Sequence, residues 1–202
     1  DWANTVAAAL AMHPDHLSAY SLGIEGGTRL AARVRRGDLV EPSPDEAASR
    51  YEHLDAAASA AGLSWYEVSN WARTPADRCR HNLGYWRDDD WWGIGPGAHS
   101  HVDGRRWWNH SGLDDWSNEA LGGRVPAAGS ETPTAEERLT EHFMLGIRLA
   151  EGISTDRVAD GSVDSLVDDG LVRRLPGPTE RIALTLRGRL LADLVVRRLR
   201  WG

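Results

Sequence analysis

Residues 43–69, SPDEAASRYEHLDAAASAAGLSWYEVS, decide the fold class because they join a well-delimited helix to a short buried strand. Ser43 is suited to cap the helix, Pro44 presets the backbone of its first turn, and Glu46 completes a Ser-x-x-Glu capping box. Gly62 is expected to end the helix. The apolar alternation from Leu63 to Ser69 predicts a strand directly after it.

The residues upstream repeat this order. Trp2 to Met12 predicts an alanine-rich helix, and Leu17 to Glu25 predicts a strand that ends at the turn Gly26-Gly27. Helix, strand, helix and strand joined by long crossovers predict parallel strands and therefore an α/β layer. A complete eight-fold barrel needs about 250 residues, so we expect residues 1–72 to form only part of a (β/α) barrel.

The rest of the chain divides in two. Residues 73–133 are rich in Gly, Trp, Asp and His and show little periodicity, so we expect a loop-heavy connecting region. Residues 134–202 recover regular patterns and predict a small α+β, winged-helix-like domain. Its expected elements are a helix from the Thr134 capping box to near Gly152, a helix at 163–168, strands at 171–175 and 181–185, and a helix at 186–201.

The composition excludes several classes of protein. The 202 residues carry a net charge of -7 and one cysteine, Cys79, so an internal disulfide is excluded and the chain alone cannot hold a zinc or iron-sulfur site through thiolates. No apolar run reaches the roughly 18 to 20 residues of a membrane span. We expect a cytoplasmic protein that could still associate with a membrane, and, because the chain does not begin with Met, a piece of a longer one.

Two residue types are unevenly distributed. All 23 basic residues are arginine, and eight of them lie after Leu171 against only Glu180 and Asp193. A basic winged-helix module could bind nucleic acid, although the acidic remainder argues against it. Eight of the ten tryptophans lie between Trp65 and Trp116, and this is where we expect function.

The motif His81-Asn82-Leu83-Gly84-Tyr85-Trp86 carries the sharpest chemical signal. On a helix, His81 and Tyr85 share one face, as do Asn82 and Trp86. An imidazole beside a phenol and an indole could serve a haem iron or a proton relay, because neutral imidazole is a strong iron ligand. A hydrogen-bonded histidine in a tryptophan-rich core is the alternative.

A glycine loop, Gly93-Ile94-Gly95-Pro96-Gly97-Ala98, precedes His99 and His101. Its spacing is not that of a dinucleotide-binding loop, so either a tight turn or close backbone access to a ligand would explain it. The two histidines are two apart and could chelate a metal on a strand, but they lack a carboxylate or thiol at a familiar spacing.

Three segments together resemble one known family. They are residues 66–73 (YEVSNWAR), residues 79–86 (CRHNLGYW) and residues 93–100 (GIGPGAHS). The chain resembles the oxygen-independent coproporphyrinogen III oxidase family of radical S-adenosylmethionine proteins, and specifically its haem-chaperone branch, which the His-Asn-x-x-Tyr-Trp signature distinguishes. The resemblance covers essentially the whole chain and implies the C-terminal half of a longer protein with an incomplete barrel.

The resemblance also implies cofactors and site residues. It implies haem bound by His81, Asn82, Tyr85 and Trp86, with His81 as the axial iron ligand. In the full-length protein it implies a 4Fe-4S cluster on three cysteines that this chain lacks, and S-adenosylmethionine contacted at positions that match Gly23 and His99 here.

We consider three possible functions, two from the resemblance and one from the C-terminal pattern. The first is a haem chaperone that delivers haem to respiratory haem apoproteins, with a homodimer left open. The second is oxidation of coproporphyrinogen in haem biosynthesis. The third, suggested by the C-terminal pattern, is a nucleic-acid-binding or partner-binding module. We expect no transmembrane segment and no nucleic-acid partner.

Overall fold

The computed structural model describes residues 1–159 and 161–201, and within these residues the strands form three separate antiparallel sheets. The helices are α1 (Trp2–Ala11), α2 (Arg29–Arg35), α3 (Pro44–Ala60), α4 (Arg80–Arg87), α5 (Leu113–Leu121), α6 (Ala135–Gly146), α7 (Ser162–Asp168), α8 (Leu186–Leu190) and α9 (Ala192–Arg198), with a 3-10 turn at Pro75–Asp77. The strands are β1 (His16–Ser18), β2 (Ser64–Glu67), β3 (Asn70–Ala72), β4 (His99–Val102), β5 (Arg105–Asn109), β6 (Ala127–Glu131), β7 (Ile153–Ser154), β8 (Val172–Leu175) and β9 (Arg181–Leu184).

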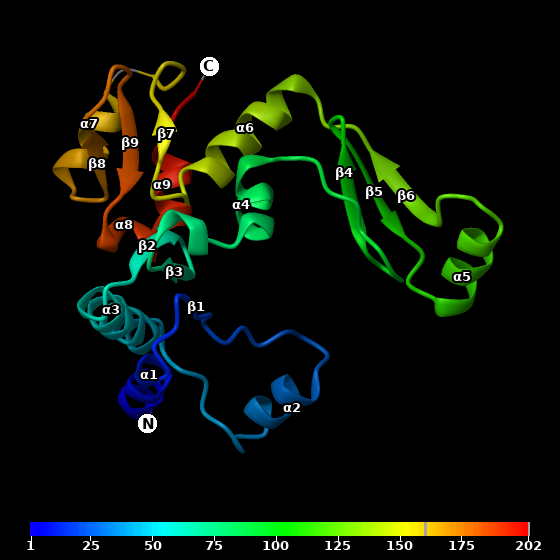
Figure 1. Ribbon diagram of the computed structural model, residues 1–202, viewed down its shortest axis with the longest axis horizontal. Helices are drawn as coiled ribbons and strands as arrows, with labels where there is room; N and C mark the ends of the chain where they lie inside the picture. The colour runs from blue at the N-terminus through cyan, green and yellow to red at the C-terminus, as the bar shows by residue number, and fades with distance from the viewer. Residues whose placement is uncertain (160, 202) are drawn as a thin grey trace.

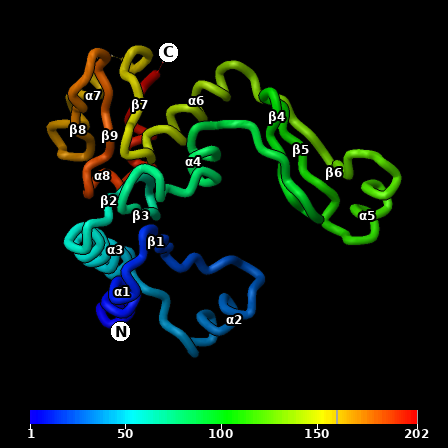
Figure 2. The backbone as a smooth tube through the Cα atoms, in the orientation of Figure 1, coloured from blue at the N-terminus to red at the C-terminus, as the bar shows by residue number. Residues whose placement is uncertain are grey.

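The arrangement is open, with the central sheet extending away from the other two (Figure 1). The chain leaves α4 to form β4–β6 and returns along α6, as the backbone trace shows (Figure 2). α4 and α6 pack side by side at the base of this extension. The haem-chaperone signature on α4 therefore lies where the three parts of the structure meet.

The long helix α3 forms as its sequence predicts. Ser43 Oγ accepts a hydrogen bond from the Glu46 amide at 3.1 Å, and Gly62 follows the helix with a positive φ of 81°. The expected capping box is only half formed, because the Glu46 carboxylate pairs with Arg50 instead. The inward face of α3 packs with α1 around Leu54 and Ala58.

The first sheet differs from the expected parallel pairing. β1 and β2 are not neighbours, because β3 lies between them and runs antiparallel to both. A two-residue turn joins β2 to β3, and such a turn can connect only antiparallel strands. β1 and β2 consequently run in the same direction. The strand expected over residues 17–25 is also shorter, since β1 ends at Ser18 and only the Ala19 amide continues the pairing, to Ser69.

The central region is more regular than the expected loop-heavy connection. β4, β5 and β6 form an antiparallel sheet with Trp107 buried within it. Asp103 and Gly104 join β4 to β5, both with positive φ, which is the backbone of a two-residue hairpin turn. The Asp-Gly pair is therefore what closes this hairpin.

The last part contains the winged-helix-like elements that its sequence predicts. Thr134 and Glu137 form a complete capping box at the start of α6. The helix expected to end near Gly152 ends at Gly146, and a short strand, β7, joins the β8–β9 hairpin. The helix expected over residues 186–201 is broken at Leu191, whose φ of -122° and ψ of 30° are not helical.

A buried ion pair joins the first and last parts. Arg189 on α8 donates to both carboxylate oxygens of Asp55 on α3, at 2.7 and 2.8 Å, and the Trp71 indole donates to the same carboxylate at 2.8 Å. The Arg189 guanidinium also lies over the Trp65 ring, 4.5 Å from its centroid. Among the described residues, no helix is long and apolar enough to cross a membrane.

Candidate functional site

The signature motif lies on the short helix α4. The helix begins after Cys79, whose amide donates to Tyr66 Oη at 3.1 Å, and it ends at Asp88, which has a left-handed backbone with φ 59°. Leu83 is the buried residue of α4 and packs with Tyr66 and Leu149. Trp86 packs against the same cluster, whereas His81 and Tyr85 are exposed on α4.

His81 is exposed and lies against Tyr85. Their ring centroids are 4.8 Å apart with an interplanar angle of 88°, an edge-to-face contact between residues one helical turn apart. Within the described part of the chain, no hydrogen bond or ion pair engages the His81 ring. The alternative of a hydrogen-bonded core histidine is therefore wrong for this residue.

The other signature residues line a small cavity next to α4. Its volume is about 200 Å³. One wall comes from α4 and the other from the β2–β3 hairpin and the segment after β1. The lining residues are Asn82, Tyr85, Trp86, Glu67, Ser69, Asn70 and Tyr20.

Glu67, at the end of β2, is the buried acid of this cavity. Only 1% of the residue is exposed, Oε2 accepts a long hydrogen bond of 3.4 Å from the Ser69 amide, and Oε1 has no partner among the described residues. Burial raises the pKa of Glu67, and contacts with the Ser69 amide and Trp86 offset part of that rise. Sequence reasoning missed this residue, although an acid inside the buried run 63–68 was a signal that could have marked it.

A row of four aromatic rings leads from the exposed histidine to a buried one. Tyr85 contacts Trp91 at 4.7 Å between centroids, and Trp91 contacts His101 at 4.9 Å. The backbones of Trp91 and His101 also pair, with hydrogen bonds of 2.7 and 2.9 Å. The packing of the central sheet thus reaches the exposed face of α4.

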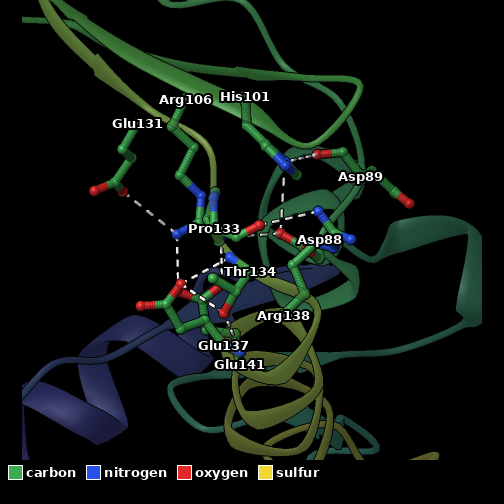
Figure 3. A network of polar contacts seen from close by, with 10 residues as sticks. All are labelled: Asp88, Asp89, His101, Arg106, Glu131, Pro133, Thr134, Glu137, Arg138 and Glu141. Atoms are coloured by element: carbon green, nitrogen blue, oxygen red, sulfur yellow. Dashed lines mark hydrogen bonds and ion pairs between the residues drawn. The ribbon is translucent and has the colours of Figure 1, made fainter.

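A polar network holds the end of α4 between the sheet and α6 (Figure 3). Arg106 on β5 makes a two-pronged contact with Glu141 on α6, and its guanidinium lies 3.8 Å from Asp88 Oδ1. His101 Nδ1 lies 3.5 Å from the same Asp88 oxygen. The hydrogen bonds with Arg106 lower the pKa of Glu141, so the pair stays charged at neutral pH.

The glycine loop folds back onto its own strand. A Cβ on Gly93 would lie 2.1 Å from the His99 carbonyl oxygen, so only glycine fits there. The Gly93 amide donates to Ser100 Oγ at 2.9 Å, and Asn109 Nδ2 donates to the Gly95 carbonyl at 2.9 Å. These contacts explain the loop as a tight turn that supports the central sheet.

The two residues matched to S-adenosylmethionine lie on different elements. Gly23 is exposed in the segment between β1 and α2, whereas His99 is exposed at the start of β4. His99 faces Trp108 and His101 faces Trp91, so the two histidines do not form a chelating pair. The described residues contain no group of three or more His, Cys, Asp or Glu side chains that could hold a metal.

Comparison with known proteins identifies relatives over the full chain. The chain is 46% identical over 202 residues to heme chaperone HemW of Mycobacterium tuberculosis, covering 98% of this chain and 51% of that protein. It is 30% identical over 200 residues to heme chaperone HemW of Bacillus subtilis, covering 95% of this chain and 52% of that protein. No family model matches the chain.

A solved structure shares the fold. Coproporphyrinogen III oxidase HemN from Escherichia coli, described as a radical SAM enzyme, matches with a TM-score of 0.68 and 19% identity, over 98% of this chain and 50% of that one. The likeness bears out the expected part of a radical-SAM α/β fold, with small sheets that do not close. The chain spans about half the length of the curated relatives it matches. From these relatives, we conclude that the chain is homologous to proteins named heme chaperone HemW over about half of their length.

Proposed function

We propose that the protein is a haem chaperone in which His81 ligates the haem iron and from which haem passes to respiratory haem proteins. The observation that carries this proposal is the exposed imidazole of His81. Within the described residues it makes no hydrogen bond, and it packs edge-to-face against the Tyr85 ring. Neutral imidazole is a strong ligand of haem iron. A ring held at the surface is suited to a carrier, because the cargo must leave again.

The size of the neighbouring cavity limits where the macrocycle can lie. At about 200 Å³ the cavity is below the roughly 300–1,000 Å³ typical of pockets for drug-sized ligands. We infer that haem lies across the open surface beside His81 and Tyr85, while Asn82 and Trp86 border its edge.

The other cofactors of the family are not held by this chain alone. A 4Fe-4S cluster needs several thiolates, and the sequence has one cysteine. We propose Gly23 and His99 as contacts to S-adenosylmethionine only in the full-length protein, since they do not line a common cavity within the described residues. No step of the proposed haem transfer is derived through either group.

Haem titration tests the proposal directly. We expect His81→Ala to change the Soret spectrum of the complex, because the iron loses a ligand, and to lower haem affinity at least about tenfold, which corresponds to about 1.4 kcal/mol. His53→Ala is the matched control, since His53 is also exposed on a helix, in α3. An unchanged Soret spectrum and affinity for His81→Ala would exclude His81 as the ligand.

The oxidase alternative has weaker support. The likeness to the Escherichia coli enzyme is at 19% identity and concerns the fold. An anaerobic assay of the reconstituted full-length protein for conversion of coproporphyrinogen separates the two functions. Product formation would favour the oxidase.

A further inference from the structure

Glu67 is a buried acid for which the haem proposal supplies no role. It is 1% exposed, it lines the cavity beside α4, and its Oε1 accepts no hydrogen bond from the described residues. Leaving a buried polar group unpaired is unfavourable, because the group has given up its hydrogen bonds to water. Trp86 contacts the Glu67 carboxyl, but Oε1 accepts no hydrogen bond within the described residues, so the position calls for a further donor.

The residues that line the cavity favour a positively charged donor over a neutral or negatively charged one. None of the lining residues is Arg, Lys or His, so no fixed positive charge faces the carboxylate. A carboxylate ligand would meet Glu67 as a like charge, or would need it protonated. A cationic donor instead gains the Coulomb attraction and satisfies Oε1 in one contact.

The remaining walls suit a cation as well. Trp86 and Tyr85 line the cavity, and aromatic rings attract cations; the Arg148 guanidinium already lies over the Trp86 ring, 6.0 Å from its centroid. Asn82 and Asn70 add amide groups, whose carbonyl oxygens can accept further hydrogen bonds from an ammonium. The volume of about 200 Å³ admits a compact group and excludes a tetrapyrrole.

We propose that this cavity is a second ligand site, which binds the primary ammonium group of a small molecule through Glu67, with Asn82 and the aromatic ring of Trp86 completing the contact. The proposed iron ligand His81 does not line the cavity, but the cavity shares Asn82, Tyr85 and Trp86 with the proposed haem surface, so the two sites are adjacent. The proposal does not depend on haem binding.

The test uses three molecules of one shape and different charge. n-Butylammonium, n-butanol and n-butyrate are titrated into the intact natural protein at constant ionic strength, and the indole N–H signal of Trp86, assigned with Trp86→Phe, is followed by NMR. Saturable binding of n-butylammonium, at least tenfold tighter than that of the other two, is expected. Equal or tighter binding of n-butyrate, or no saturable binding of n-butylammonium, would overturn the proposal.

Two variants assign the contact. Glu67→Gln keeps the side-chain shape and removes the charge, and it should weaken n-butylammonium binding at least tenfold, whereas Glu67→Asp should retain part of the affinity. Glu52→Gln, an exposed acid on α3, is the matched control and should change nothing. If Glu67→Gln does not fold, Asn82→Leu, on the surface of α4, should still weaken binding several-fold. Unaltered affinity in the folded variants would contradict the site.

Discussion

The ionisation of Glu67, the acid of the proposed ligand site, should make the stability of the protein depend on pH. Burial raises its pKa above the ordinary value of 4.5, so the folded protein keeps a proton that the unfolded chain has already released. The free energy of unfolding should therefore fall as the pH rises from about 4.5 through the raised pKa. Glu67→Gln cannot titrate and should lack this decline.

Urea unfolding of the wild type and Glu67→Gln at a series of pH values measures the effect. Glu52→Gln, whose side chain is exposed, should follow the wild type. Parallel curves for the wild type and Glu67→Gln would show that the Glu67 carboxyl titrates alike in the folded and unfolded states.

Gly93 is required by a single close approach. A Cβ at this position would lie 2.1 Å from the His99 carbonyl oxygen, which is backbone and cannot turn aside. We expect Gly93→Ala to destabilise the protein by about 1–3 kcal/mol, the usual cost of overpacking. Gly23→Ala is the control, because a Cβ added there would meet nothing within 4 Å.

Chemical denaturation compares the two alanine variants with the wild type. Equal stability of Gly93→Ala and Gly23→Ala would mean that the turn before β4 can shift without loss. The hydrogen bond from the Gly93 amide to Ser100 Oγ would then have to form in the shifted turn as well.

The pairing of α3 with α8 rests on Asp55 and Arg189. Their side chains are 15% and 8% exposed, and although burial alone would raise the pKa of Asp55, hydrogen bonds from Arg189 and Trp71 outweigh it and the pKa is lowered. Removing one partner leaves a buried charge unpaired. Arg189→Met should therefore cost about 3–5 kcal/mol.

An exposed pair provides the contrast. Arg174 contacts Asp164 and Glu180 with 44% of its side chain exposed, and such pairs contribute about 0–1 kcal/mol, so Arg174→Met should be nearly neutral. Combining Asp55→Leu with Arg189→Met should restore part of the loss in thermal unfolding, because neither charge is then stranded. Additive losses would show that the two residues act independently.

The sequence predicts helix and strand boundaries wrongly where long-range contacts override local conformational preference. The break between α8 and α9 has no proline to predict it. Gly188 packs so closely on the Leu171 carbonyl that a Cβ would lie 1.8 Å from its oxygen, which fixes α8 against β8 before Leu191 turns the chain. The β4–β5 hairpin, in contrast, had a readable signal in Asp103-Gly104.

The extended sheet is attached to the rest of the protein partly through Arg106. The Arg106–Glu141 pair joins β5 to α6, and side-chain exposures of 22% and 30% leave it only partly screened (Figure 3). Hydrogen bonds between charged groups contribute about 1–3 kcal/mol. Arg106→Met should therefore let the β4–β6 amides exchange roughly tenfold faster.

Hydrogen exchange by mass spectrometry over residues 99–131 checks this expectation. Arg124→Met removes an exposed arginine that pairs with Glu119 in the same region, and it should leave exchange in the three strands unchanged. Faster exchange confined to the position of substitution would show that the Arg106 contact does not hold the sheet.

Three of the eight arginines that follow Leu171 pair with carboxylates within the described residues. Arg174 pairs with Asp164 and Glu180, Arg198 with Asp169, and Arg189 with Asp55. Nucleic-acid affinity depends on cations that can replace counterions at phosphates. The pairing reduces the number of cations that a phosphate backbone could contact by three.

Caps, turns and short motifs act over a few residues, so the local pattern was enough to predict the helix starts at Ser43 and Thr134, the β8–β9 hairpin and the shared helix face of His81 and Tyr85. The same motifs predicted the HemW relatives. Long-range packing, in contrast, placed β3 between β1 and β2, buried Glu67 with Oε1 unpartnered among the described residues, and let Arg106 and Arg189 join distant elements. Each of these depends on residues far apart in the chain, whose meeting follows from the packing of the core and cannot be read from local pattern.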